Sequence, residues 1–251
     1  MTSRPVDLSL PQPLSSILPK LYPLILDGTG SVRQQLLKLL RALLRNEMSD
    51  HILEILPYVR AGMTHLAADI RLFSVEVLAW LVNIAADEVV SCAGGWVKTL
   101  NCFLAVLGWH TQDSGKWSSN RVSLGKATSD GKAQARNLQV LADLLRAGLF
   151  FATDLSHADE NWQPRPTFPL WHTEHHVLPK RSNPYGYLNL FGPEKDDDLD
   201  MLEDREDRIR VFNERFASAM EVGLASARKD GGEVGRAAGL VTKVLKSIDG
   251  G

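Results

Sequence analysis

The chain has 251 residues, of which 44% are hydrophobic. This is enough for one large or two small domains that fold without stabilising disulfides or metal ions. Its formal net charge of −2 excludes a global attraction to nucleic acid or acidic lipid, so any RNA contact must come from a local patch. Two cysteines are too few for a disulfide scaffold, and no apolar run approaches the roughly 18 residues of a membrane span. With no apolar signal-peptide core at the N-terminus, we expect a soluble protein in a reducing compartment inside the cell.

Two apolar runs open the chain after a Pro- and Ser-rich stretch at residues 1–12, which predicts an extended N-terminus. The first run, at 14–25, has helical spacing, although two prolines interrupt it. The turn sequence DGTGSVR follows at 27–33, and a second amphipathic run continues over 32–45. These features predict a first pair of helices joined by a short corner.

The same pattern recurs at residues 51–68 and 72–85, with a short corner at 68–71. The arginines of the two corners lie 38 positions apart. A unit of about 40 residues, with an Asp before an aliphatic–Arg pair at its corner, is typical of HEAT repeats, whose helix pairs stack because one pair cannot bury its apolar face alone. We expect each corner Asp to cap the next helix and each corner Arg to reach carbonyls or an Asp of the neighbouring repeat. The corner residues are Asp27, Arg33, Asp69 and Arg71.

A third pair of helices is predicted at residues 94–109 and 134–151, on either side of a polar insertion at 110–133. The apolar residues of the second of these helices are spaced by three and four, and strand signals are weak throughout the chain. The sequence therefore predicts an all-α protein whose HEAT/armadillo-like repeats occupy residues 13–151.

The segment at 152–207 differs from this body because prolines and aromatic residues stand among polar ones, and it ends in an acidic run. We expect an extended arm and an acidic strip that bind partners, because exposed aromatic residues and dense charge are otherwise hard to justify. C-terminal helices at 208–251 complete the predicted architecture. The candidate partner-binding residues of the arm and strip are Trp171, Tyr185, Tyr187, Phe191, Asp196, Asp197 and Asp198.

The polar insertion and the helix after it form a basic segment that contains a tryptophan, which is a pattern suited to RNA phosphates and a stacked base. A solvated insertion with no binding role is the alternative reading. The candidate RNA contacts are Lys116, Trp117, Arg121, Lys126 and Lys132, and Arg136 extends the set.

Arg60 and His65 lie in the segment YVRAGMTHLAADIR, where His65 and Asp69 are four apart and would share a face of one helix. The segment can form a polar network between repeats or a partner-binding face.

Enzymatic patterns are weak. WHTEHH at 171–176 offers His and Glu ligands, but its spacing matches no familiar zinc motif. A dyad of Cys92 or Cys102 with His65 has no support from spacing, and GGEVGRAAG lacks the strand that precedes a phosphate loop. We therefore expect no catalytic residues, no metal and no cofactor, and we keep a zinc hydrolase only as a third hypothesis.

Several long blocks resemble one family: RAGMTHLAADIR, EVVSCAGGWVKTLNCFLAVLGW, SNPYGYLNLFG, DREDRIRVFNERF, GGEVGRAAG and LPQPLSSILPKLYPLILDGTGSVRQQLLKLLRAL. The chain is similar to the pre-rRNA-processing family named "involved in processing of internal transcribed spacer two". The blocks occur along the chain in the same order as in that family, and the similarity covers nearly all of residues 8–245. The chain is similar to the fungal members of this family and to their animal relative, a testis-expressed nuclear protein.

The resemblance implies a nuclear scaffold, found in nucleolus and nucleoplasm, rather than an enzyme. Family members belong to the Rix complex, with a β-propeller subunit and a second helical-repeat subunit as partners. That complex acts on precursors of the large ribosomal subunit, cooperates with a midasin-type ATPase and is needed to remove the second internal transcribed spacer. Family members usually begin with a Lys-rich tail and an earlier helical stretch, whereas this chain begins at MTSRPVD and therefore looks short at its N-terminus. Direct RNA binding through residues 116–136 is the alternative function.

Overall fold

The computed structural model describes residues 14–42, 50–109, 131–150 and 201–249, and within these ranges every regular element is helical. The prediction of an all-α protein is therefore confirmed for the described part of the chain. None of its helices is long and apolar enough to cross a membrane. The elements are α1 Leu14–Leu21, the 3₁₀ helix η1 Tyr22–Leu26, α2 Gly30–Ala42, α4 Ile52–Met63, α5 Ala68–Ile84, α6 Ala86–Ser91, α7 Gly95–Leu107, α8 Gly131–Leu149, α9 Arg205–Arg215, α10 Ala217–Asp230 and α11 Gly232–Asp249.

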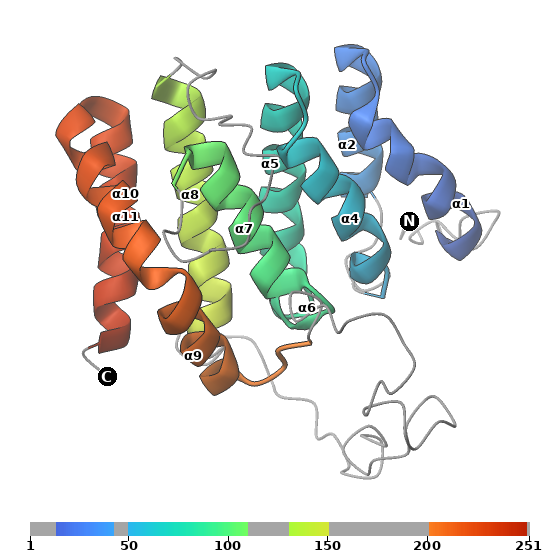
Figure 1. Ribbon diagram of the computed structural model, residues 1–251. Helices are drawn as coiled ribbons and strands as arrows, with labels where there is room; N and C mark the ends of the chain where they lie inside the picture. The colour runs from blue at the N-terminus through green and yellow to red at the C-terminus, as the bar shows by residue number, and fades with distance from the viewer. Residues whose placement is uncertain (1–13, 43–49, 110–130, 151–200, 250–251) are drawn as a thin grey trace, which may run out of the picture.

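The helices form two stacked layers (Figure 1). In one layer α1 and η1 are followed by α4, α7 and α10, and η1 packs on α4, α4 on α7, and α7 on α10. In the other layer α2, α5, α8 and α11 follow one another, each packed on the next. Across the layers α4 pairs with α5, α7 with α8, and α10 with α11. The two C-terminal helices α10 and α11 thus extend the same stack as the N-terminal ones.

Apolar faces with helical spacing build a single core between the layers. Leu138, Leu141, Leu145 and Leu149 repeat at three and four positions along α8, and all four are fully buried. The core runs without a break from α1 to α11. Because a Leu side chain contributes about 1.5–3 kcal/mol when fully buried, this continuous face holds the stack together more strongly than any one polar contact.

The C-terminal region differs in detail from its predicted helices. The spacing of Ile209, Phe212, Phe216 and Met220 suggests one helix, but α9 ends at Arg215 and α10 begins at Ala217. Phe216 at the break is only 1% exposed, so the chain changes direction while that ring stays in the core. Helix α9 also begins three residues before 208, inside the acidic run, where acidic side chains in the first turn are favoured by the helix dipole.

Candidate functional site

Three buried arginines hold the chain at the entrance to a helix, and we call each an arginine clasp. Arg33, Arg71 and Arg208 are each the fourth residue of their helix, and each is 4% exposed or less. Each donates from Nη1 to backbone carbonyls five or six residues earlier. A cation in the first turn of a helix interacts unfavourably with the helix dipole, and burial also removes its hydration. The hydrogen bonds to the backbone carbonyls offset both costs.

The first clasp links two neighbouring corners. Arg33 donates to the Asp27 carbonyl, and its other nitrogen Nη2 forms an ion pair with the exposed Asp69 carboxylate. This hydrogen bond is the main reason that the pKa of Asp69 lies below its ordinary value. The Arg33 guanidinium also lies 5.8 Å from the centre of the Phe73 ring. The corner between η1 and α2 is thereby tied to the first turns of α5.

The side chains of the corner aspartates do not cap helices as the sequence suggested. Helix α5 has no side-chain cap, because Asp69 lies in its first turn and turns toward Arg33 instead. The Asp27 carboxylate accepts a 2.6 Å hydrogen bond from the Thr29 backbone N–H, which stabilises the turn before α2.

The predicted shared helix face of His65 and Asp69 is wrong. Helix α4 ends at Met63, so His65 lies in the turn before α5. Its Nδ1 accepts a 3.0 Å hydrogen bond from the Ala67 backbone N–H, and its carbonyl accepts from Arg71 at 2.8 Å. The structure thus places His65 within the turn held by the second clasp.

Arg60 on α4 lies near Cys92, which follows α6, and near Cys102 on α7. The Arg60 guanidinium donates a 2.6 Å hydrogen bond to the Gly94 carbonyl in the turn before α7, and burial lowers its pKa. Burial raises the pKa of the Cys92 thiol, and it raises that of Cys102 to about 11. A nucleophilic cysteine needs a lowered pKa, so these thiols have the opposite electrostatic setting.

Arg208 forms a third clasp that the sequence did not predict. It donates from Nε to the Gly148 carbonyl at the end of α8 and from Nη1 to two carbonyls just before α9. The Trp96 indole N–H in turn donates a 3.2 Å hydrogen bond to the Arg208 carbonyl. Arg208 shares the fourth helix position with Arg33 and Arg71, but an acidic residue precedes it in place of an aliphatic one, so the match is recognisable only once the start of α9 is known.

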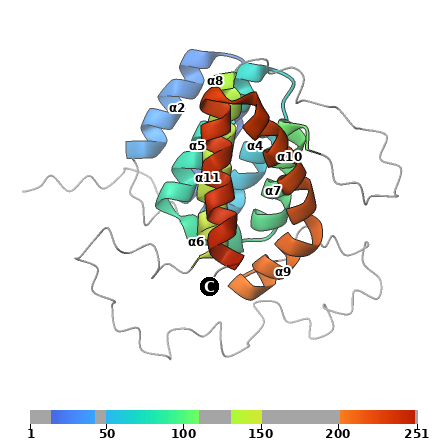
Figure 2. The same ribbon diagram turned by 90° about the vertical axis from the view of Figure 1, so that its left-hand side faces the viewer.

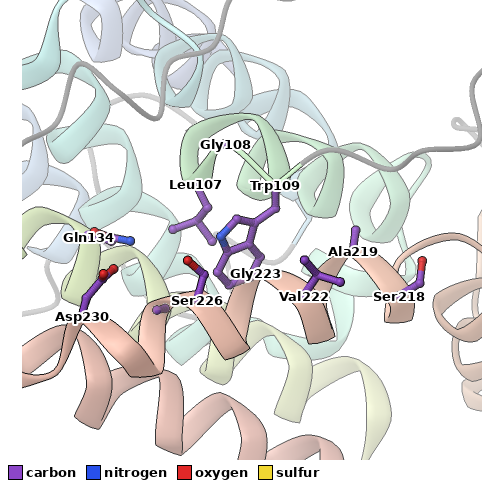
Figure 3. A pocket seen from close by; sticks show the side chains of 11 residues that line it. Leu107, Gly108, Trp109, Gln134, Ser218, Ala219, Val222, Gly223, Ser226 and Asp230 are labelled. Carbon is purple, nitrogen blue, oxygen red and sulfur yellow. The ribbon is translucent and has the colours of Figure 1, made fainter.

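A groove runs along α10 on the described surface, and we call it the Trp109 groove. Its volume is about 650 Å³. Figure 3 shows the Trp109 indole over the middle of α10, beside Leu107, with polar side chains toward both ends of the groove. A Cβ atom at Gly223 would overlap this indole, so only glycine permits the close approach. The groove is lined by Leu107, Gly108, Trp109, Gln134, Ser218, Ala219, Val222, Gly223, Ser226, Ala227 and Asp230.

The composition of the Trp109 groove suits recognition of a protein or peptide. Val222 is 74% exposed, and the partly buried Trp109 provides a rigid aromatic surface. An apolar centre with a rim of hydroxyl, amide and carboxylate groups is typical of protein interfaces. The groove could not be recognised from the sequence, because Trp109 and Gly223 are far apart in the chain.

The other candidate residues divide between described and undescribed parts of the chain. Lys132 lies exposed in the first turn of α8. Arg136 is exposed one turn further along α8. The candidate arm residues, the acidic residues at 196–198, the histidine cluster at 171–176 and the basic insertion residues 116–126 lie outside the described residues. Within the described residues, no three His, Cys, Asp or Glu side chains are grouped to hold a metal ion.

Comparison with known proteins assigns the chain to a family. A family model described as "Rix1 complex component involved in 60S ribosome maturation" matches residues 46–145, which extend from just before α4 through most of α8. The pre-rRNA-processing protein ipi1 of Aspergillus fumigatus is 55% identical over 251 residues, covering 98% of this chain and 73% of that protein. The chain belongs to the Ipi1 family.

More distant members of the Ipi1 family agree over a similar span. The ipi1 protein of Sclerotinia sclerotiorum is 47% identical, with 98% of this chain and 72% of that protein covered. The IPI1 protein of Chaetomium thermophilum is 44% identical, with 92% and 67% covered. The likeness therefore extends over the whole described stack, including α9 to α11, well beyond the segment that the family model matches.

Proposed function

We propose that this chain is a non-catalytic scaffold subunit of the Rix complex, which acts in maturation of the large ribosomal subunit. The observation that carries the proposal is its 55% identity, over 98% of its length, to a protein named for pre-rRNA processing. The finer proposal, from the family resemblance, is that the chain is needed for processing of the second internal transcribed spacer. Its site of action is then the nucleus, in nucleolus and nucleoplasm.

A HEAT/armadillo-like repeat architecture is part of this proposal. The two layers of stacked helices and the matching clasps at Arg33 and Arg71 support it. In a stack of this kind each helix pair contacts mainly its neighbours, which leaves long surfaces free for partners. The buried arginines serve backbone carbonyls, so their role is to fix the angle between helices rather than to act on a substrate.

The proposed partners are the β-propeller and helical-repeat subunits of the Rix complex and the precursor of the large ribosomal subunit. A midasin-type ATPase is a further, indirect partner. The aromatic arm and acidic strip remain our candidates for docking, and the Trp109 groove is an additional candidate. The exposed Val222 beside the Trp109 indole supports this assignment, because apolar anchors ringed by polar groups carry most of the binding energy at protein interfaces.

Depletion and rescue in a fungal host tests the proposed function. The host's own family member is placed under a repressible promoter, and this chain is supplied from a plasmid. We expect depletion to cause accumulation of precursors that hybridise to a probe for the second internal transcribed spacer. We expect this chain to restore their normal level, because it is 55% identical to a family member over 73% of that protein's length.

An unrelated helical-repeat protein expressed to the same level is the control, and it should not rescue. Persistent accumulation of the spacer-containing precursor, despite expression and nuclear location of this chain, would reject a role in that step. Rescue by a quadruple Ala variant of the three histidines and the glutamate at 172–176 is also expected. Failure of that variant would favour the zinc hydrolase hypothesis.

A further inference from the structure

An open groove of about 730 Å³ lies between the first turns of α8 and α11, and we call it the basic groove. The two helices run side by side and both begin at the upper end of the stack in Figure 1. A Cβ atom at Gly131 would lie 3.7 Å from a methyl group of Val234, which confirms that their first turns are adjacent. The main side chains on the groove are Lys132, Arg136 and Gln139 from α8 and Glu233, Arg236 and Leu240 from α11.

The basic groove carries three cations and one carboxylate, in contrast to the net charge of −2 for the whole chain. Lys132 and Arg136 are one turn apart on α8, and Arg236 faces them from a helix about 100 positions later. Arg136 and Arg236 are exposed, and neither makes a salt bridge within the described residues. Asp143, two turns further along α8, influences Arg136 only at longer range. A concave surface lined by one sign of charge concentrates an anion of the opposite sign.

The shape and chemistry of the basic groove favour a phosphate chain over an acidic protein segment. A guanidinium presents paired donors that match the oxygens of a phosphate or a carboxylate group, so the apolar surroundings decide between the two. A protein partner needs a buried apolar anchor, but the only exposed large hydrophobic residue here is Leu240 at 43% exposure. Figure 2 shows that α11 lies at the end of the stack, where no further described helix covers it.

The sequence on the N-terminal side of α8 agrees with this preference. Lys116, Arg121 and Lys126 precede Lys132 in the chain, with Trp117 among them. These residues lie outside the described ranges, so they contribute only composition to the argument. The structure adds Arg236, which comes from a part of the sequence that gives no hint of an association with this segment.

We propose that the basic groove between α8 and α11 binds the phosphate backbone of single-stranded RNA, with Arg136 and Arg236 as its main contacts. RNA binding goes beyond the scaffold function. It does not depend on that function, because the isolated chain can be tested for it without any partner of the complex. Such a groove would hold RNA with little sequence preference, since phosphate contacts position a strand without reading its bases.

The test measures binding of a fluorescent 20-nucleotide single-stranded RNA to the full chain by anisotropy at several salt concentrations. The groove variant R136E/R236E is compared with R136Q/R236Q, which removes charge without reversing it. The matched control is K243E/K246E, which changes the same net charge at two exposed positions further along α11. Circular dichroism establishes that each protein keeps its helical content, and the Gln variant replaces the Glu variant if the latter does not fold.

We expect the groove variant to raise the Kd at least about tenfold and the control to change it less than about twofold. We also expect the Gln variant to reduce the slope of log K against log salt by about 1.4, the value for two lost single-strand phosphate contacts. The proposal is overturned if the parent chain does not bind RNA or if the groove variant binds it as well as the parent. It is also overturned if the control weakens RNA binding as much as the groove variant does. A Glu-rich peptide is the second probe, and if the groove variant loses that peptide while RNA binding is unchanged, the proposal is likewise overturned.

Discussion

Thr99 is a fully buried residue of α7 whose hydroxyl has no hydrogen-bond partner among the described residues. A buried hydroxyl without a partner costs free energy, whereas a methyl group of the same shape does not. We therefore predict that Thr99→Val raises the free energy of unfolding by about 1 kcal/mol, measured by chemical denaturation.

Thr242→Val is the matched control for this change. The Thr242 hydroxyl donates a 2.9 Å hydrogen bond to the Ala238 carbonyl, so its replacement should give no such gain. If Thr99→Val lowered the stability as much as the loss of an ordinary buried hydrogen bond does, the Thr99 hydroxyl would have a hydrogen-bond partner after all.

Cys102 tests the electrostatics of the core at the same scale. Burial raises the pKa of its thiol from an ordinary 9.0 to about 11, and the thiolate is the form that reacts with alkylating agents. At pH 8 the folded protein should therefore carry about 100-fold less thiolate at Cys102 than the unfolded chain does. We predict at least this ratio between the alkylation rates measured by mass spectrometry in denaturant and in native buffer.

The pH dependence of that rate follows from the direction of the shift. Because the native pKa is raised, the native alkylation rate should keep rising above pH 9, where an ordinary thiol levels off, as long as the fold persists. A native rate that levels off near pH 9, or that equals the denatured rate, would show that the thiol is not held in a buried setting.

Helix α9 depends on the Arg208 clasp for its attachment to the stack. Arg208→Ala would leave the carbonyls of Gly148, Leu202 and Glu203 without these donors. We predict a loss of stability on the order of 3 kcal/mol, with faster amide exchange throughout α9 and α10 by mass spectrometry.

Arg210→Ala on the same helix is the control for the clasp. The Arg210 side chain is 64% exposed and pairs only with Asp207, three residues earlier, within the described residues. An exposed pair of this kind contributes about 0–1 kcal/mol. If the two alanine variants had the same stability and exchange, the clasp would have no role in holding α9.

Helix faces were predictable from the sequence because they depend on neighbouring positions. The spacing of Leu138 to Leu149 identified the buried face of α8 with no knowledge of its partner helices. The Arg208 clasp and the contact of Trp109 with Gly223 depend instead on which distant helices meet. His65 shows that helix ends are hard to predict even within a short segment. Helix α4 ends at Met63, two residues before His65, so His65 lies in a turn and does not share a helix face with Asp69.

Val222 offers a test of partner binding on the whole molecule. Because it is 74% exposed, Val222→Glu should leave the fold intact while placing a charge beside the indole in the Trp109 groove. We predict at least a tenfold loss in recovery of a Rix-complex subunit in pull-downs. Leu66→Glu, at an 80% exposed residue in the turn before α5, is the control and should bind normally. Equal recovery with both variants would remove the groove from the interface.

Replacing residues 160–200 with a Gly/Ser linker of equal length tests the arm and acidic strip. The replacement stops at 200 because the carbonyls of Leu202 and Glu203 accept hydrogen bonds from Arg208. We predict that partner recovery falls sharply while the helical circular dichroism signal is retained. Parallel loss of binding and helicity would indicate that the segment stabilises the fold rather than docks a partner.

As a scaffold subunit, this chain is proposed to hold partners in the Rix complex. Affinity purification of the tagged chain from a fungal host that lacks its own family member, with quantitative mass spectrometry, tests it most directly. We expect enrichment of the β-propeller subunit, the helical-repeat subunit and precursors of the large ribosomal subunit. Recovery of the folded chain without any of these partners would contradict it.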